Sequence, residues 1–189
     1  MRKGDSRPGA LLQFSGIFVS FAMTDKVLSN PSVMRVQAAL AAAGIAADVI
    51  VTEEATPSAQ AAALKHGCDV GQIAKSVIFR ALHSDRVVLV ITSGANRVSE
   101  ARVVAEIGEP IGRADAAFVK ERTGFSIGGV APVGHLAPPI TLFDQTLLRF
   151  AVIYPAAGHP NTGFAVDPHA LARAAGARIC SVIEHREGT

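Results

Sequence analysis

Hydrophobic positions near the start of the chain repeat with a helical period. Four apolar residues recur three or four positions apart: Val33, Val36, Leu40 and Ala43. Asn30 and Pro31 precede them as a cap and a helix-starting proline, and Gly44 follows as a stop. Comparable start and stop signals predict four further helices, over residues 56–66, 99–108, 115–122 and 167–175. The helix over 115–122 is expected to end in a glycine cap at Gly124.

A different pattern, without helical periodicity, predicts the strands. Val87 to Thr92 is a continuous run rich in β-branched residues, which is typical of a strand buried on both faces. Ser84-Asp85 stands where a hairpin loop would join this strand to the one before it. The remaining predicted strands cover residues 47–52, 76–82, 110–112, 140–143, 147–154 and 179–183. The irregular order of strands and helices predicts one mixed α/β domain, because a doubly wound fold would show regular βαβ alternation.

Composition supports a single domain with a substantial core. The 189 residues are 49% apolar, and because tryptophan is absent, aliphatic side chains must fill the interior. The formal net charge is only +2, with no polybasic tract, which argues against binding nucleic acid by bulk charge alone. Cys68 and Cys180 are far apart and form no metal-binding spacing, as expected for two reduced thiols in a cytoplasmic protein.

The N-terminal segment has its own character. Arg2, Lys3 and Arg7 precede an interrupted apolar run over residues 10–23, a pattern that superficially resembles a signal peptide. Nothing later in the chain has the character of a secreted protein. We therefore interpret residues 1–22 as an N-terminal extension, with the functional domain over residues 23–189. No other stretch approaches the length of uninterrupted apolar sequence that a membrane span needs.

The segment TGFSIGGVAPVGH, from Thr123 to His135, contains four glycines and a proline. It lacks both the GxGxxG spacing of a dinucleotide site and the Gly-Lys-Ser/Thr of a P-loop. Two interpretations stay open. The glycines either form a tight turn that needs positive φ angles, or they allow a ligand to approach bare backbone N–H groups, as in an oxyanion hole. In the second case Pro132 would stiffen the loop.

Lys75 is the second candidate for chemistry. It stands at the head of an apolar strand, in the sequence IAKSVIFRA. Such a charge is often a solvated strand end. If partly buried, however, it can stabilise developing negative charge.

Three motifs together carry a resemblance to a known family. Lys75 in IAKSVIFRA, the sequence GANR at Gly94 to Arg97, and TGFSIGGVAPVGH resemble the YbaK/ProX family, the free-standing relatives of the editing domain of bacterial prolyl-tRNA synthetases. The resemblance covers residues 28–183 in matching order. It implies a largely antiparallel, curved mixed sheet with flanking helices. It also implies metal-independent hydrolysis, without a cofactor, of the ester in a mischarged aminoacyl-tRNA.

The resemblance also implies roles for particular residues. Lys75, Gly128 and Gly129 match the catalytic positions, with the glycines contacting the aminoacyl group through their backbone. Residues implied or considered as substrate contacts are Asn96, Arg97, Pro132, His135 and Asp144. Four of these have a structural alternative: Asn96 and Arg97 as a polar strand end, Asp144 as a turn residue, and His135 as a surface or packing histidine. His135 is singled out among the histidines because it closes the glycine-rich loop.

The sequence departs from many cysteinyl-tRNA-Pro deacylases of this family at one position. Those proteins read Gly-Gly-x-Ser-Pro where this chain has Ala131 before Pro132. The lost hydroxyl argues against cysteine as the substrate. We expect a trans-editing deacylase for a small amino acid on tRNA-Pro or a related tRNA, with a synthetase as a possible partner. A non-catalytic module that binds tRNA or a synthetase, and a small-molecule esterase, are the alternatives.

Overall fold

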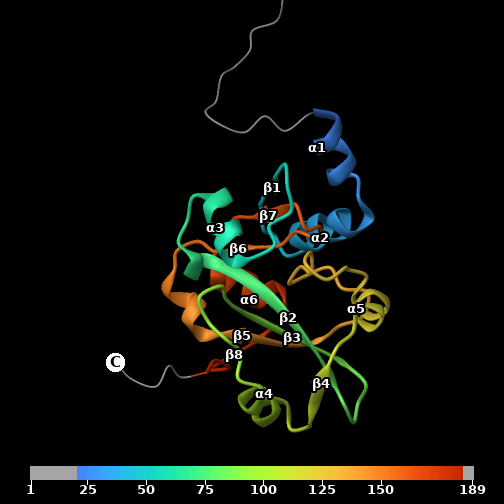
Figure 1. Ribbon diagram of the computed structural model, residues 1–189, viewed down its shortest axis with the longest axis vertical. Coiled ribbons are helices and arrows are strands. Elements are labelled where there is room, and N and C mark those ends of the chain that lie inside the picture. Colours follow the sequence, from blue (N-terminus) through green and yellow to red (C-terminus); the bar gives the residue numbers. More distant parts are fainter. Residues whose placement is uncertain (1–20, 185–189) are drawn as a thin grey trace, which may run out of the picture.

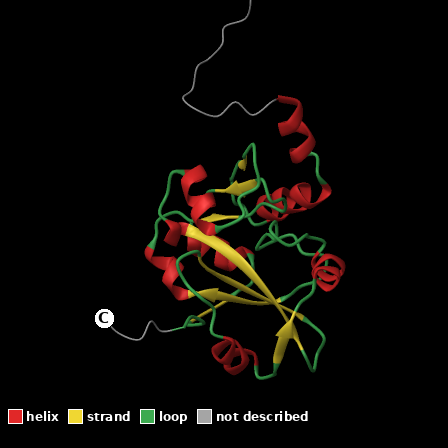
Figure 2. Cartoon of the chain, in the orientation of Figure 1, coloured by secondary structure: helices red, strands yellow, loops and turns green. Residues whose placement is uncertain are grey.

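The computed structural model describes residues 21–184, which form a mixed α/β domain (Figures 1 and 2). The helices are α1 (Phe21–Leu28), α2 (Pro31–Ala42), α3 (Ala59–His66), α4 (Glu100–Ile107), α5 (Ala116–Thr123) and α6 (Pro168–Ala174), with the 3₁₀ helices η1 (Val70–Gln72) and η2 (Gln145–Arg149). The strands are β1 (Val49–Val51), β2 (Ile73–Ala81), β3 (Val87–Ser93), β4 (Ile111–Arg113), β5 (Ile140–Asp144), β6 (Tyr154–Pro155), β7 (Thr162–Phe164) and β8 (Arg178–Cys180).

The larger sheet is built around β3. Its strands follow the order β4-β2-β3-β5-β8, and β6 pairs with the N-terminal end of β2. The pairs of β2 with β3 and β4 are antiparallel, whereas those of β3 with β5, β5 with β8 and β2 with β6 are parallel. A small antiparallel sheet joins β1 to β7. The mixed α/β class predicted from the sequence is confirmed. The larger sheet is not largely antiparallel, because three of its five strand pairs are parallel.

Two hydrophobic clusters cover the two faces of this sheet. Every residue of β3 is buried, as its continuous apolar run predicted. One face packs against residues of α2, α5 and α6 together with the glycine-rich loop, centred on Phe125 and Phe143. The other face packs against α4 through Val103. Successive side chains of β2 therefore alternate between two different environments.

Capping residues in the sequence predicted the positions of five of the helices. Asn30, Ser58, Asp115 and Asp167 each accept a hydrogen bond from a backbone N–H in the first turn of the helix that follows. The glycine caps at Gly108 and Gly124 have the left-handed conformation that a helix C-terminus favours. The five predicted helices are confirmed, with shifts of one to three residues at their ends.

The predicted strand over residues 147–154 is wrong. Residues 145–149 form the 3₁₀ helix η2, and only Tyr154 and Pro155 enter a sheet. Asp144 caps η2 through the Thr146 N–H, which turns the chain as soon as β5 ends. Leu147 and Ile153 are apolar because they pack into the core from a turn and a loop rather than from one strand. Strand β7 was not predicted.

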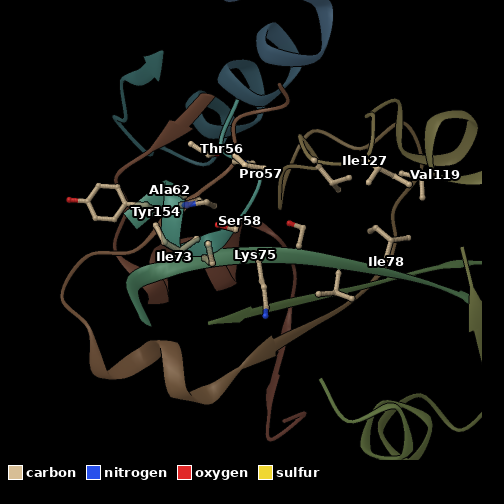
Figure 3. A pocket seen from close by; sticks show the side chains of 18 of the residues that line it. Thr56, Pro57, Ser58, Ala62, Ile73, Lys75, Ile78, Val119, Ile127 and Tyr154 are labelled. Carbon is tan, nitrogen blue, oxygen red and sulfur yellow. The ribbon is translucent and has the colours of Figure 1, made fainter. Parts of the chain in front are cut away.

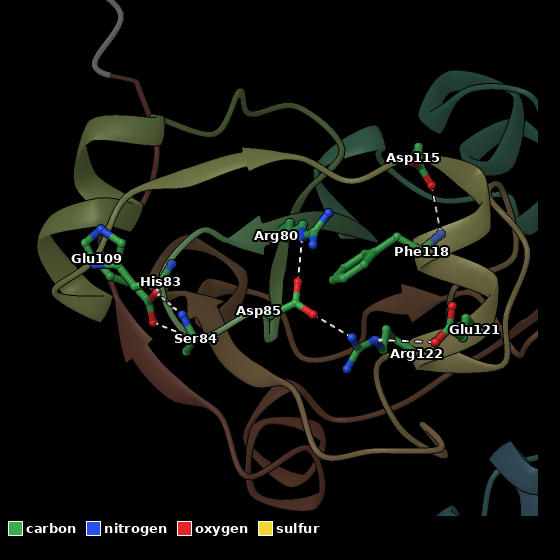
Figure 4. A network of polar contacts seen from close by, with 9 residues as sticks. All are labelled: Arg80, His83, Ser84, Asp85, Glu109, Asp115, Phe118, Glu121 and Arg122. Atoms are coloured by element: carbon green, nitrogen blue, oxygen red, sulfur yellow. Dashed lines mark hydrogen bonds and ion pairs between the residues drawn. The ribbon is translucent and has the colours of Figure 1, made fainter.

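The hairpin turn between β2 and β3 is tied to α5 (Figure 4). The Asp85 carboxylate lies 2.6 Å from Arg80 Nε and 2.5 Å from Arg122 Nη2. Both guanidinium groups also lie over the ring of Phe118. Because exposed ion pairs contribute little stability, this network mainly fixes the orientation of α5, whose C-terminus leads into the glycine-rich loop.

Helix α1 crosses the predicted domain boundary at Met23. Residues 1–20 lie outside the described part of the chain, while Phe21 and Ala22 begin α1. Val27, later in the same helix, is buried. The domain boundary therefore stays a prediction. No helix within residues 21–184 is long and apolar enough to cross a membrane.

Candidate active site

A pocket of about 430 Å³ opens above β2, between the N-terminus of α3 and the glycine-rich loop (Figure 3). Its floor is the backbone and side chains of β2 from Ile73 to Ile78. Thr56, Pro57 and Ser58 line one side of the pocket, and Ile127 lies across from them (Figure 3). Gly128 and Val130, from the same loop as Ile127, also line the pocket. Tyr154 of β6 lies at one end, and Val119 of α5 lies at the other.

The alternation of β2 decides which side chains face the pocket. Ala74 and Ile78 belong to the cluster beneath the glycine-rich loop, so Ser76, between them, shares that face. Val77 belongs to the opposite cluster, and Lys75 shares its face. In Figure 3 the Lys75 ammonium accordingly extends away from Thr56 and Pro57, to the far side of the strand. The lysine lines the pocket, but its charge lies behind the floor.

Behind the floor, Lys75 joins a polar cluster. Its Nζ donates to the Asn96 carbonyl oxygen at 2.5 Å. The Asn96 side chain donates to Asp144 and to the Thr146 hydroxyl, each at 2.8 Å. Burial and the nearby Arg97 charge lower the pKa of Lys75, while Asp144 acts in the opposite direction. The cluster therefore fixes the loop after β3 against β2.

Asp144 is the buried anion of this cluster, with no exposed surface. Burial by itself raises its pKa, but hydrogen bonds from the Thr146 N–H, Thr92 and Asn96 outweigh that effect and lower the pKa. The carboxylate is thus ionised and fully occupied by partners within the chain. Asp144 caps the turn after β5 through the Thr146 N–H, and its side chain does not line the pocket. A contact between Asp144 and the α-amino group of a substrate stays a prediction.

The two adjacent glycines of the loop have different surroundings. Gly128 is exposed, lines the pocket and has a φ of +91°, which side-chain-bearing residues rarely adopt. No hydrogen bond within the described residues uses its N–H, which leaves that donor available to a ligand. Gly129 is buried, and its N–H donates to the Ser126 carbonyl at 3.0 Å. A Cβ on Gly129 would lie 2.8 Å from the His159 carbonyl carbon.

Arg35 of α2 holds both ends of the glycine-rich loop. Its guanidinium donates to the carbonyl oxygen of Gly124 at 3.0 Å and to that of Gly134 at 3.2 Å. It also lies 5.2 Å from the centre of the Phe125 ring. One planar side chain thereby fixes the separation between the loop's start and its end.

His135 and Pro132 support the loop from inside rather than from the pocket. His135 Nε2 donates to the Ala131 carbonyl at 2.8 Å, and its ring meets Phe125 edge to face. Burial lowers the pKa of His135, with a smaller opposing effect from the hydrogen bond to Ala131, so the ring is neutral near pH 7. Pro132 is buried. Neither residue lines the pocket, so a direct contact of either with the substrate stays a prediction.

Ser76 is a functional candidate that the sequence motifs do not indicate. It lines the pocket, and its Oγ is buried without a hydrogen-bond partner among the described residues. Leaving a hydroxyl buried and unpaired costs about 1–3 kcal/mol, which a bound ligand could recover. The available signal was its place one residue after Lys75, since adjacent strand residues face opposite sides.

The pocket therefore separates the predicted site residues into two groups. Lys75 and Gly128 line it, Lys75 from the floor and Gly128 from the wall. Asn96 and Asp144 contact Lys75 or its partners behind the floor, and Arg97 is exposed nearby. Gly129, Pro132 and His135 form the interior of the glycine-rich loop. Only the fold reveals that most of the motif residues lie behind the floor or inside the loop rather than meeting within the pocket.

The described residues offer few other reactive groups. No cluster of three or more His, Cys, Asp or Glu side chains within residues 21–184 has a metal-binding arrangement. Cys68 and Cys180 are free thiols, and burial raises the pKa of Cys180 to about 11. Within the pocket lining, no serine is hydrogen-bonded to a histidine, since Ser58 caps α3 and Ser76 is unpaired.

Comparison with known proteins identifies the class to which this fold and pocket belong. Residues 53–174 match the family described as the aminoacyl-tRNA editing domain, and this range contains the pocket and the polar cluster behind it. The chain therefore belongs to the aminoacyl-tRNA editing domain family and resembles the YbaK/ProX deacylases, as the motifs predicted.

Individual relatives support the same family. The uncharacterized protein YwhH of Bacillus subtilis (strain 168) is 31% identical over 124 residues, which are 66% of this chain and 78% of YwhH. The crystal structure of a candidate trans-editing enzyme for prolyl tRNA synthetase matches with 35% identity and a TM-score of 0.77, covering 82% of this chain and 99% of that one. The crystal structure of protein APE2540 matches with 27% identity and a TM-score of 0.73, covering 79% and 99%.

Proposed function

We propose that this protein hydrolyses, in trans, the ester between a small amino acid and the 3′-terminal ribose of a mischarged tRNA. One observation carries the proposal. The pocket has an unoccupied backbone donor at Gly128 in one wall and an unpaired hydroxyl at Ser76 in its floor. An aminoacyl ester can satisfy both groups, because it offers a carbonyl oxygen to the N–H and an α-amino group to the hydroxyl oxygen.

In the reaction, water adds to the ester carbonyl carbon, and the negative charge develops on the carbonyl oxygen. The Gly128 N–H donates to that oxygen, and the positive Lys75 behind the floor favours the same charge. The bond from the carbonyl carbon to the ribose oxygen then breaks, and the ribose oxygen takes a proton. The products are the free amino acid and an uncharged tRNA. The attacking group is water or a group of the substrate, because the pocket holds no paired protein nucleophile.

Lys75 acts in this proposal through its positive charge and through the backbone it positions, without contacting the ester. Its ammonium is bonded to Asn96 on the far face of β2, and both are tied to Asp144. This arrangement fixes the backbone of Lys75 and Ser76 at the floor of the pocket. The family resemblance implies that a lysine at this position is important. The arrangement agrees with that importance, although the ammonium does not contact the ester directly.

The end of the pocket beside the glycine-rich loop sets the size of the amino acid. Ile78, Val119 and Ile127 make it aliphatic (Figure 3). An alanyl or aminobutyryl side chain leaves no polar group unpaired there, whereas a seryl hydroxyl would have to be buried among hydrocarbon. Ala131 is fully buried and does not line the pocket, so its missing hydroxyl argues against cysteine only through the family resemblance.

The tRNA is proposed from a relative and from charge. The 35% identical structure carries a description that names prolyl tRNA synthetase, which supports tRNA-Pro as the substrate. A net charge of +2 provides weak attraction for a polyanion. We therefore expect a synthetase to contribute affinity as a partner.

The test is a deacylation panel on tRNA-Pro charged with alanine, aminobutyrate, serine, cysteine or proline. We expect alanyl- and aminobutyryl-tRNA to be hydrolysed fastest and prolyl-tRNA to be spared. A preference for the cysteinyl or seryl ester would overturn the assignment of the aliphatic end. If the protein binds these tRNAs and hydrolyses none of them, the non-catalytic module is the correct function.

A further inference from the structure

The end of the pocket away from the glycine-rich loop contains a stacked pair of rings. Tyr154 and His66 lie nearly parallel, with centroids 5.0 Å apart and planes 19° from each other. Both residues line the pocket, and both are half-buried. The Tyr154 hydroxyl points away from Thr56 and Pro57 (Figure 3) and forms no hydrogen bond within the described residues. The tyrosine therefore offers the pocket a π-surface rather than a polar group.

Both rings of the pair are held by neighbouring strands. His66 is the last residue of α3, and its ring lies against the backbone of Gly163 in β7, where an added Cβ would be 2.8 Å from Nε2. Tyr154 is fixed by its register opposite Ile73 in the parallel pairing of β6 with β2. Burial lowers the pKa of His66, so the ring is neutral near pH 7 and carries no charge that would favour a phosphate. Apolar neighbours Ala62, Ile73 and Pro155 continue this surface.

The position of the pair matches the shape of the substrate. Tyr154 lies beside Ile73, and the aliphatic end lies beside Ile78, five residues further along β2. At about 3.3 Å per residue, the two ends are separated by roughly 17 Å. A ligand that fills such a groove has an aliphatic group at one end and a flat group at the other. An amino acid, a ribose and a base joined in series have this form.

We propose that Tyr154 and His66 form a stacking platform for the terminal adenine of the tRNA, while the aminoacyl group lies at the glycine-rich end. This inference rests on the proposed function, because it assigns the other half of the same substrate. Aromatic side chains bind unpaired bases by stacking in many single-strand binding proteins. The platform would supply affinity common to all tRNAs, and the aliphatic end would supply selectivity for the amino acid.

The experiment uses two stable probes. One is 3′-alanylamino-3′-deoxyadenosine, in which an amide replaces the ester, and the other is the same alanylamino ribose without a base. Tyr154 is the chain's one tyrosine, and tryptophan is absent, so tyrosine fluorescence of the full chain reports on this position alone. We expect the adenine-bearing probe to change the fluorescence and to bind roughly 5- to 100-fold more tightly than the baseless probe, as one stacked base predicts.

Variants measured by calorimetry complete the test. Tyr154→Leu should lose the affinity difference between the probes, whereas Tyr154→Phe should keep it. Phe118→Leu, which removes a half-buried ring outside the pocket, is the matched control and should also keep it. Because the two probes are compared within each variant, a partly unfolded preparation changes both affinities equally and leaves their ratio intact.

The outcomes separate this inference from the proposed function. If the wild-type chain deacylates tRNA but binds both probes equally, or if Tyr154→Leu keeps the difference, the platform is wrong and the deacylase stands. If the chain hydrolyses no ester but shows the Tyr154-dependent preference for adenine, the platform stands and the catalytic proposal fails.

Discussion

At the scale of single residues, Gly128 and Gly129 show how neighbours in one motif serve different purposes. The sequence predicted that both expose backbone to the substrate. In the structure, Gly128 has the positive φ and the free N–H, whereas Gly129 is enclosed by the backbone of His159 and Pro160. Glycine is thus needed at the first position for conformation and access, and at the second for packing.

We therefore expect Gly128→Ala and Gly129→Ala to fail in different ways. Gly128→Ala should cost about 1–2 kcal/mol of stability from its positive φ, and should lower the rate per folded molecule because the loop donor shifts. Gly129→Ala should lower stability more, because its Cβ would lie 2.8–2.9 Å from backbone atoms that cannot easily move. Urea midpoints measured beside kcat/KM separate the two effects. Equal stability losses with unchanged rates per folded enzyme would show that both glycines are purely structural.

At the scale of the element, β2 places a pocket-lining hydroxyl and a lysine charge on opposite faces. Ser76 faces the pocket, and Lys75 faces the polar cluster behind it. The period of two in a strand makes this division unavoidable once one of the two is placed. Substituting Ser76 therefore tests the pocket, whereas substituting Lys75 tests the polar cluster behind it.

We expect Lys75→Ala to reduce kcat/KM by roughly 10²-fold, because it removes the positive charge behind the floor and releases Asn96. Its urea midpoint should also fall, since buried Asp144 loses a neighbouring cation. Ser76→Ala should instead raise KM about 3- to 10-fold, the value of one hydrogen bond, with no loss of stability. Deacylation kinetics beside urea titrations distinguish them. Full activity in a folded Lys75→Ala variant would eliminate the proposed role of the lysine.

At the scale of the whole molecule, the editing domain family match covers residues 53–174, while α1 and α2 precede it. Helix α2 belongs to the functional unit, because Arg35 holds the glycine-rich loop and Val36 and Leu40 pack into the main core. Helix α1 contributes buried Val27. The domain therefore extends N-terminal to the family match.

A chain beginning at Met23 tests where the domain starts. It keeps Val27 and all of α2, so we expect its thermal midpoint and deacylation rate to equal those of the full chain. Thermal melts monitored by circular dichroism, with the same tRNA assay, provide the comparison. A chain beginning at Arg35 is the matched control and should unfold, because it lacks the first turn of α2, with buried Val33, and the Asn30 cap. Unfolding of the Met23 chain would place the boundary earlier.

Much of this protein follows from local sequence. Caps such as Asn30 and Asp115 act within one helical turn, so the five helices from α2 to α6 were predictable from neighbouring residues, whereas α1 was not predicted. The β-branched run of β3 indicated its burial for the same reason. The three motifs also sufficed to indicate the family, because their order along the chain is itself specific. The strand predicted over residues 147–154 was wrong because an apolar run of this composition fits a turn that packs into the core as well as a strand.

Tertiary structure decided how the motif residues divide around the pocket. Lys75, Gly128 and Asp144 are far apart in sequence, and no local pattern shows that a strand separates the lysine's charge from the glycine wall. Likewise Arg35 meets Gly134 across 99 positions, and His66 meets Tyr154 only because β6 pairs with β2. Such contacts depend on strand register and on which face of a sheet each segment covers. These are properties of long-range packing, and the local signals that placed the helices carry no information about them.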